Sequence, residues 1–254
     1  MNVLIVYKDK EDSKNKISKI RFDNYFKVKY SWKNTLEKQD LKNADIVISI
    51  GGDGTALSAA NYLIDKPLLA VNSSPKTSEG ALTTVSLEEL EEKLRDIKNK
   101  GYKTEKLERI EVSINGRTIS PLALNEVFIA NERAYLISRY KILFENGINR
   151  TEEKQMSSGL IFTTGTGSTG WFKSAGGEPF SPQAKFIKML VREPFIRRLS
   201  KFNLVSQTIK EKDLIEVSSG TKSVLAIDSI REFKIKEGDR IRIKVSENPL
   251  LRIV

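Results

Sequence analysis

The residues best suited to chemistry form a glycine-rich turn with a single carboxylate. Residues 46–50 read Ile-Val-Ile-Ser-Ile, a mostly β-branched run that is typical of a buried parallel strand. Directly after it come Gly51, Gly52, Asp53, Gly54 and Thr55, and a helical pattern follows over 55–63. Free backbone N–H groups at a helix start favour a phosphate, and glycines let a ligand approach the backbone closely. Asp53 amid such donors is suited to work with a metal ion or to accept a proton from a hydroxyl.

This turn differs from the two best-known phosphate-binding motifs. It lacks the Gly-Lys-Ser/Thr of a Walker A loop, and it lacks the Gly-x-Gly-x-x-Gly of a dinucleotide fingerprint. The alternative without chemistry is a tight strand-to-helix turn that carries a surface aspartate.

A second strand places another polar side chain near the first. Residues 68–71 read Leu-Leu-Ala-Val and are followed by Asn72, so strand, turn, helix and strand form a βαβ pattern. Ligands of such parallel sheets bind beyond the carboxyl ends of the strands. We therefore expect Asp53 and Asn72 to face one crevice.

An amide and a carboxylate stand side by side later in the chain. Asn125 and Glu126 lie within the apolar segment 123–129. Adjacent strand residues point to opposite faces, but at a strand end or a bulge both side chains can reach a ligand. The pair could hold the edge of an adenine or a ribose diol, and the alternative is an ordinary turn between strands.

A second Gly/Ser/Thr loop follows the strand-like residues 160–164. Its polar or aromatic members are Thr166, Gly167, Ser168, Thr169, Gly170, Trp171 and Ser174. Hydroxyls and free N–H groups at this density suit phosphate and ribose oxygens. The alternative is a flexible linker, which the preceding strand and the aromatic Trp171 disfavour.

The elements that must position these residues change in kind along the chain. Ser86 and Glu89 form a capping box before a helix over 87–100, and Gly101 ends that helix. Further helices are predicted over 32–41 and 183–191. Strands are predicted over 3–7, 109–114, 117–120, 136–144, 160–164, 214–217, 224–227 and 240–245, with Asn115-Gly116 as a hairpin turn. We expect an α/β domain over residues 1–101 and a mainly-β domain over 102–254.

Composition excludes several classes of chemistry. The 254 residues contain no Cys and no His, so disulfides, thiolate chemistry and imidazole catalysis are excluded. The N-terminus begins with a strand pattern and does not have the basic, apolar and small-residue regions of a signal peptide. We therefore expect a cytoplasmic protein. The formal charge of +10 comes largely from dispersed Lys beside Glu or Asp, which predicts a solvated surface. We expect no nucleic-acid partner and no membrane partner.

Taken in order, these motifs resemble the NAD kinase family. The resemblance rests on Gly51–Thr55, Asn72, Asn125-Glu126 and the loop from Thr166 to Ser174, and it covers about residues 44–254. Ser157-Ser158-Gly159 replaces the usual Gly-Asp-Gly, as in the divergent branch that includes the mitochondrial NAD kinase of animals and the plant NADH kinase. Ser158 cannot supply the charge of that aspartate, which in the main family helps to bind the nicotinamide half of the substrate.

The resemblance implies a two-domain fold and a phosphotransferase. Asp53 would act on the adenosine 2′-hydroxyl of NAD or NADH, and ATP with Mg²⁺ would be the donor. Backbone groups of Gly51, Gly52, Gly54 and Thr55 would hold phosphates, Asn125 and Glu126 the adenosine, and Thr166–Trp171 with Ser174 the dinucleotide, while no dedicated metal cage is expected. A homodimer or homotetramer is implied, and the C-terminal tail can return to the first domain.

Two other functions stay open from the residues alone. One is a kinase of another substrate with the same Gly-Gly-Asp-Gly turn, which Asn125-Glu126 and the second loop disfavour. The other is a dinucleotide-binding sensor without catalysis, which the presence of Asp53 disfavours. The preference between NAD and NADH, and between ATP and polyphosphate as donor, is also open.

Overall fold

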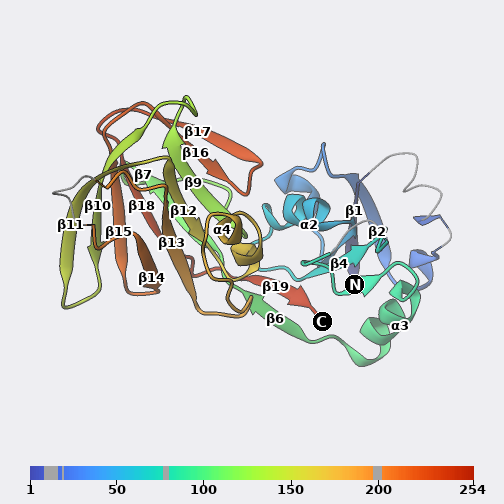
Figure 1. The fold of residues 1–254 in the computed structure, drawn as a ribbon. Helices are drawn as coiled ribbons and strands as arrows, with labels where there is room; N and C mark the ends of the chain where they lie inside the picture. The colour runs from blue at the N-terminus through green and yellow to red at the C-terminus, as the bar shows by residue number, and fades with distance from the viewer. Residues whose placement is uncertain (9–16, 19, 77–79, 197–201) are drawn as a thin grey trace. The chain divides into compact units, whose positions relative to one another are not determined.

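The chain forms two compact units, which are described separately. The structure is a computed structural model, and it describes residues 1–8, 17–18, 20–76, 80–196 and 202–254 (Figure 1). The N-terminal unit contains residues 1–106 together with 249–254, and the C-terminal unit contains residues 107–248. The last six residues thus belong to the first unit, although they follow the second in sequence.

The N-terminal unit is built on a sheet with strand order β2-β1-β3-β4-β19-β6, and β5 also pairs with β4. The pairs β1–β2, β1–β3, β3–β4, β4–β5 and β4–β19 are parallel. Its strands are β1 (Asn2–Tyr7), β2 (Lys27–Trp32), β3 (Ile46–Gly51), β4 (Leu68–Asn72), β5 (Val85–Ser86), β6 (Thr104–Leu107) and β19 (Leu250–Ile253). Every residue of β3 and β4 is buried, as expected for central strands of a sheet with both faces covered. The predicted strands at 3–7, 46–50 and 68–71 are confirmed.

Two of the helices expected in this unit form, but with other bounds: the one expected over 55–63 spans 53–60, and the one expected over 87–100 begins at Leu90. α2 (Asp53–Ala60) starts directly after the glycine turn, and α3 (Leu90–Lys100) follows the capping box. Glu89 accepts a hydrogen bond from the Ser86 backbone N–H at 2.9 Å, and Gly101 has a φ of 77° after the last helical residue.

The predicted helix over 32–41 is wrong. Trp32 instead ends β2 in parallel register with Tyr7, and only the short 3-10 helix η2 (Lys38–Leu41) forms. Sheet pairing outweighs the local helical preference here. A second 3-10 helix, η1 (Phe22–Asn24), precedes β2.

The C-terminal unit consists of two six-stranded antiparallel sheets, counted over the described residues. One has the order β11-β10-β15-β18-β7-β8 and the other β14-β13-β12-β9-β16-β17. The strands are β7 (Ile110–Ile114), β8 (Arg117–Thr118), β9 (Glu126–Asn131), β10 (Ser138–Glu145), β11 (Arg150–Ser157), β12 (Gly159–Thr163), β13 (Phe186–Arg192), β14 (Ser206–Lys210), β15 (Leu214–Ser219), β16 (Ser223–Ile227), β17 (Arg231–Ile235) and β18 (Arg240–Val245).

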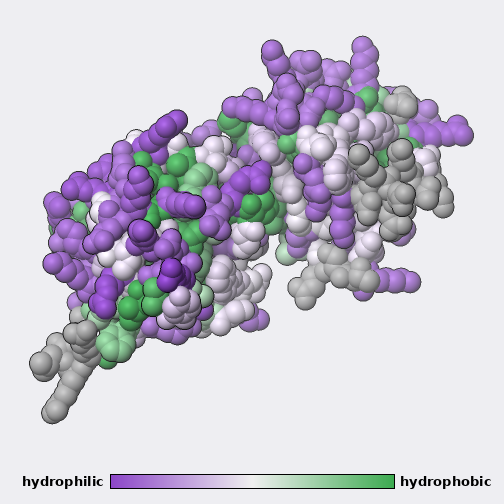
Figure 2. All heavy atoms as spheres, turned by 90° about the horizontal axis from the view of Figure 1, so that it is seen from above, coloured by the Kyte–Doolittle hydropathy of each residue, from purple (hydrophilic) through white to green (hydrophobic). Residues whose placement is uncertain are grey.

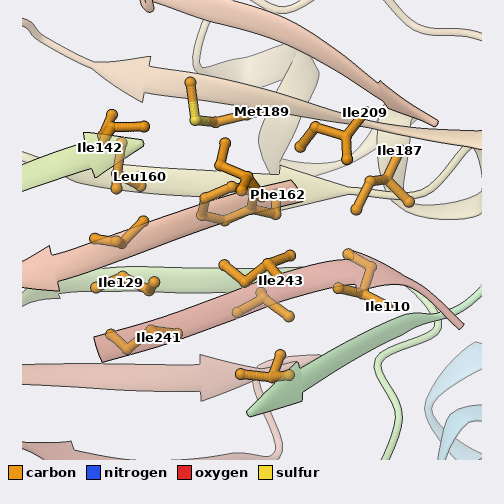
Figure 3. Packing of buried hydrophobic residues seen from close by; sticks show 14 of the residues in the cluster. Ile110, Ile129, Ile142, Leu160, Phe162, Ile187, Met189, Ile209, Ile241 and Ile243 are labelled. Carbon is orange, nitrogen blue, oxygen red and sulfur yellow. The ribbon is translucent and has the colours of Figure 1, made fainter. Parts of the chain in front are cut away.

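The two sheets share one apolar core. Figure 3 shows Phe162 of β12 between Met189 of β13, from its own sheet, and Ile243 of β18, from the other sheet. All three side chains are fully shielded from solvent. In strands such as β13, β15 and β18 the buried residues alternate with more exposed ones, as expected where one face of a sheet is buried, whereas all residues of the central strand β12 are buried.

The second predicted helix, over 183–191, is also wrong. This segment contains the strand β13, in which Ile187, Met189 and Val191 are buried while the residues between them are partly exposed. That alternation has a period of two, which belongs to a strand and not to a helix. In contrast, the predicted hairpin at Asn115-Gly116 is confirmed, because both residues have positive φ and Ile114 pairs with Arg117.

Hydrophilic side chains cover most of the face shown in Figure 2, in keeping with the formal charge of +10. Among the described residues, no helix combines the length and the apolar character needed to cross a membrane.

Candidate active site

The glycine turn lies at the edge where four parallel strands end. β1 ends at Tyr7, β2 at Trp32, β3 at Gly51 and β4 at Asn72, and the strand register places these ends side by side. The residues that follow each strand therefore gather in one place.

Two glycines of the turn have different roles. A Cβ atom on Gly51 would lie 2.3 Å from Thr55 Oγ1, so close packing of the turn requires glycine there. Gly54 is exposed and has no heavy atom within 4 Å of an added Cβ. Its backbone is thus open to a ligand at the start of α2.

The carboxylate of Asp53 is held by two backbone donors. Ala81 N–H donates to Oδ2 at 3.0 Å, and Leu82 N–H donates to Oδ1 at 2.9 Å. A carboxylate has about four acceptor positions, so these two bonds orient the group and leave positions for another donor. A substrate hydroxyl or a metal-bound water could use them.

A hollow of about 410 Å³ adjoins the turn. It is lined by Lys8, Lys33, Gly52, Asp53, Gly54, Thr55, Asn72, Ser73 and Ser74. Its charged lining residues are Asp53 and two lysines, so cations, hydroxyls and backbone N–H groups face the same space. Such a lining suits phosphate oxygens.

Lys8 and Lys33 belong to no sequence motif that predicts a site. Lys8 directly follows β1, and Lys33 directly follows β2. The backbone of Lys33 is fixed by a hydrogen bond from its N–H to the Tyr7 carbonyl at 3.1 Å. The signal that could have found them is their place after two strands of the same parallel sheet.

Asn72 lines the hollow, and its side chain also holds the backbone of another lining residue, Ser74. It is 6% exposed, and its Oδ1 accepts a hydrogen bond from Ser74 N–H at 2.9 Å. Gly80 packs so closely that an added Cβ would lie 2.6 Å from Asn72 Nδ2. The expected proximity of Asn72 and Asp53 is present, since both line this hollow.

In the C-terminal unit, the residue that organises the Asn125-Glu126 pair is Asp228. Its carboxylate accepts hydrogen bonds from three successive backbone N–H groups: Leu124 at 2.9 Å, Asn125 at 2.7 Å and Glu126 at 3.2 Å. Asp228 follows β16 and has a φ of 50°. The sequence alone leaves two interpretations of Asp228 open: a residue that lines the site, or a turn residue after the strand predicted over 224–227.

Burial sets the charges around this pair. It raises the pKa of Glu126 to about 7, with a further contribution from the negative charge of Asp228. It also raises the pKa of Asp228 to about 6, against the three N–H bonds and the nearby Arg109, which lower it. Arg109 is 1% exposed, and burial lowers its pKa to about 10.

The second loop packs against the same backbone. Thr164 N–H donates to the Asn125 carbonyl at 2.9 Å, and a Cβ on Gly167 would lie 2.4 Å from that carbonyl oxygen. Ser168 is fully buried, and its hydroxyl bonds to Gly165 and Phe180. We infer that Ser168 supports the loop and does not contact a ligand.

The remaining loop residues are more accessible. Thr166 opens the 3-10 helix η3 (Thr166–Thr169), and its buried Oγ1 has no hydrogen-bond partner among the described residues. Thr169 and Gly170 are exposed, as is Ser174 at the end of α4 (Trp171–Ser174).

Trp171 belongs to a stack of three side chains. Its ring centroid lies 4.5 Å from that of Phe128, and the Arg192 guanidinium lies 5.5 Å from the Trp171 ring and 5.7 Å from the Phe128 ring. Arg192 thus fixes the aromatic pair through cation–π contacts. No pattern in the sequence predicts a site role for Arg192.

Ser158 lies apart from the Asn125-Glu126 pair within this unit. Glu126 pairs with Thr163 at one end of β12, whereas Ser158 precedes the other end. The separation is roughly 17 Å along the strand. Ser158 is exposed, and its N–H donates to the Arg192 carbonyl at 3.0 Å.

No cluster of three or more His, Cys, Asp or Glu that could hold a metal ion occurs among the described residues. The hollow of the N-terminal unit contributes one carboxylate, Asp53. That donor set fits an Mg²⁺ ion whose other ligands are phosphate oxygens and water, which is how Mg²⁺ usually binds with nucleotides.

Comparison with known proteins covers the whole chain. The family model described as the ATP-NAD kinase N-terminal domain matches residues 4–102, and that of the ATP-NAD kinase C-terminal domain matches residues 102–254. An NAD kinase of Thermoplasma volcanium is 30% identical over 206 residues, which are 81% of this chain and 72% of the relative.

Two further relatives agree with this result. A probable NADH kinase of Oryza sativa is 27% identical over 87% of this chain and 75% of its own. The crystal structure of an NAD kinase from Archaeoglobus fulgidus in complex with ATP is 25% identical, with a TM-score of 0.79, covering 100% of this chain and 94% of that one. The expected resemblance to the plant NADH kinase is confirmed. With both of its domain models matched and its two-unit fold shared with a solved NAD kinase, this chain belongs to the NAD kinase family.

Proposed function

We propose that this chain is an NAD(H) kinase, which transfers a phosphoryl group from ATP to the adenosine 2′-hydroxyl of NAD or NADH. Membership of the family supports the activity, and the ATP complex of the Archaeoglobus relative supports the donor. The observation that carries the residue assignment is the Asp53 carboxylate, oriented by two backbone N–H groups beside a cationic hollow.

In this proposal the N-terminal unit binds the phosphates of ATP and activates the adenosine 2′-hydroxyl of the dinucleotide. Lys8, Lys33 and the N–H groups of Gly52, Gly54 and Thr55 hold the phosphates of the donor. Asp53 orients the 2′-hydroxyl and accepts its proton as the O–P bond to the γ-phosphoryl group forms and the bond from that phosphorus to the ADP oxygen breaks. Phosphoryl transfer depends mainly on positioning and on charge stabilisation, which this set of groups supplies.

Mg²⁺ is part of the same proposal. When bound, it neutralises charge on the phosphates of the donor. Asp53 is the residue of the hollow that would contact the ion or one of its waters.

The C-terminal unit binds the dinucleotide. Asn125 and Glu126 bind the adenosine portion. The rest of the molecule is contacted by the second loop through Thr166, Gly167, Thr169, Gly170, Trp171 and Ser174, with Ser168 supporting the loop from within. The raised pKa of Glu126 allows its carboxyl group to be protonated near neutral pH, so that it can donate as well as accept a hydrogen bond. Asn72 and Ser158 remain proposed ligand contacts.

The proposed assembly rests on the family resemblance, and the proposed location and partners rest on the composition and the N-terminal pattern of the chain. We propose a homodimer or homotetramer in the cytoplasm, with small-molecule partners and no nucleic-acid or membrane partner. Light scattering coupled to size-exclusion chromatography tests the oligomer: a monomeric mass at micromolar concentration would refute this part.

The deciding experiment measures NADP and NADPH formation from NAD or NADH with Mg-ATP. We expect turnover by the wild type and a loss of at least 100-fold in kcat for Asp53→Asn. Asp45→Asn is the matched control, because Asp45 also accepts a backbone N–H, from Asn2 at 2.7 Å, but precedes β3 at its other end. Dinucleotide binding without turnover by the wild type would support a sensor instead. Phosphorylation only of a different substrate would support the other kinase reading.

A further inference from the structure

The third residue from the C-terminus is a buried arginine in the sheet of the N-terminal unit. Arg252 lies in β19, pairs in parallel register with Leu68 of β4, and is 9% exposed (Figure 1). Its Nε donates to Glu105 Oε1 at 2.6 Å, and its Nη2 is also paired with that carboxylate. The guanidinium is therefore fixed by an ion pair that is largely shielded from solvent.

The third nitrogen of this guanidinium, Nη1, faces the backbone segment whose N–H groups bind Asp53. Arg252 Nη1 donates to the carbonyl oxygens of Ala81 and Leu82, at 3.2 Å each. The N–H groups of the same two residues donate to the Asp53 carboxylate. One peptide group, between Ala81 and Leu82, thus has its carbonyl on Arg252 and its N–H on Asp53.

We infer that Arg252 is a positioning residue for Asp53 and acts through the Ala81–Leu82 peptide. This inference rests on the proposed function, in which Asp53 acts on the substrate hydroxyl. A hydrogen bond to the carbonyl of a peptide polarises its N–H, so the donor that faces Asp53 is strengthened as well as fixed in place. Glu105 in turn fixes the guanidinium, which keeps this chain of contacts in one geometry.

Anchoring of the C-terminal strand does not by itself require these contacts. Thr84 Oγ1 donates to the Ile253 carbonyl at 2.9 Å, Val254 N–H to Lys103 at 3.1 Å, and Lys93 Nζ to the Val254 carbonyl at 2.6 Å. The two bonds from Arg252 to the carbonyls of Ala81 and Leu82 are made in addition to these anchoring contacts. They bind the same backbone segment whose N–H groups hold Asp53.

The test compares kcat with KM for Arg252→Gln, Arg252→Lys and Glu105→Gln. We expect kcat per folded molecule to fall 10- to 100-fold for Arg252→Gln, with the KM of ATP and of the dinucleotide within about threefold of wild type, because the loss is one of orientation. Arg252→Lys keeps the charge beside Glu105 but cannot make all four bonds, so its kcat falls less. Lys93→Met loosens the same strand end and should keep the wild-type kcat.

A readout independent of activity is amide exchange at Ala81 and Leu82. We expect protection of both amides to fall at least 10-fold in Arg252→Gln, while the β4 amides stay protected. If Arg252→Gln does not fold, Arg252→Lys and Glu105→Gln carry both measurements. A wild-type kcat in all folded variants, or a loss equal to that of Lys93→Met, would overturn the inference. An inactive wild type with the expected exchange pattern would refute the proposed function and leave the contact with Asp53 standing.

Discussion

Asp228 Oδ1 lies 2.7 Å from the backbone nitrogen of Asn125, 103 residues earlier in the chain. The same carboxylate also binds the N–H groups on either side of Asn125. Three successive backbone N–H groups converge on the Asp228 carboxylate. This carboxylate therefore fixes the backbone conformation at the start of β9. The pair Asn125-Glu126 is therefore presented by a residue of a distant strand connection.

We predict that Asp228→Asn weakens both folding and dinucleotide binding. The amide has one acceptor oxygen in place of two, so one or more buried N–H groups lose their partner, and Arg109 loses a nearby negative charge. The free energy of unfolding should fall by about 2–4 kcal/mol, and the KM of the dinucleotide should rise at least 10-fold.

Chemical denaturation and steady-state kinetics measure these two effects. Asp239→Asn is the control, because Asp239 accepts the Lys236 N–H at 2.7 Å in a surface turn. The Asp239→Asn change should lower the free energy of unfolding by less than about 1 kcal/mol and leave the KM of the dinucleotide unchanged. Equal losses in the two variants would show that Asp228 has no special role.

We predict that Gly167→Ala disrupts the second loop. The new Cβ would lie 2.4 Å from the Asn125 carbonyl oxygen, so either the loop or that peptide must move. The expected cost is about 2–4 kcal/mol of unfolding free energy, together with a higher KM for the dinucleotide.

The stability control for this change is Gly170→Ala, where an added Cβ meets nothing nearer than 3.5 Å. Thermal and chemical unfolding of the two variants should therefore differ clearly. A Gly167→Ala protein as stable as Gly170→Ala would contradict the close packing on Asn125.

We predict a pH dependence of stability that comes from Glu126. Its pKa is raised in the folded protein from 4.5 to about 7, so the folded state binds more protons than the unfolded state between these values. Its stabilising contribution is complete below pH 4.5 and is lost as the pH rises through 7.

The variant Glu126→Gln has no carboxyl group at this position, so its stability should not fall in this way as the pH rises through 7. The difference in unfolding free energy between variant and wild type should therefore change by about 3 kcal/mol between pH 4.5 and 8, in favour of the variant at high pH. Urea denaturation at a series of pH values measures it. A difference that stays constant with pH would mean that the carboxyl group is not perturbed.

We predict that the two tryptophans report on different ligands. Trp171 stacks on Phe128 and Arg192 near the second loop, whereas the Trp32 indole N–H donates to the carbonyl of Lys8, which lines the hollow. With Trp32→Phe, the remaining fluorescence should respond to NAD or NADH. With Trp171→Phe, it should respond to ATP.

Fluorescence titration of both single-tryptophan proteins provides the measurement. The far-UV circular dichroism of each should match the wild type, since each keeps an aromatic ring at the changed position. A Trp171 signal that responds to ATP alone would contradict the assignment of the second loop to the dinucleotide.

The sequence by itself determined the local elements with strong patterns. β3, β4 and the glycine turn followed from a β-branched run and its glycines, α3 followed from its capping box, and the Asn115-Gly116 hairpin from its turn residues. These signals are local, because side-chain shape, backbone freedom and capping act within a few residues. The helix expected over 183–191 failed because its apolar residues fit two periods, and only pairing with β12 and β14 selected the strand.

The tertiary structure alone decided what surrounds the candidate site residues. Lys8 and Lys33 reach the hollow because four parallel strands end at one edge. Asp228 meets Asn125 and Arg252 meets the peptide behind Asp53 through contacts that span more than 100 residues. No spacing in the chain encodes such contacts, since they arise from sheet order and from the burial of polar groups that must find partners.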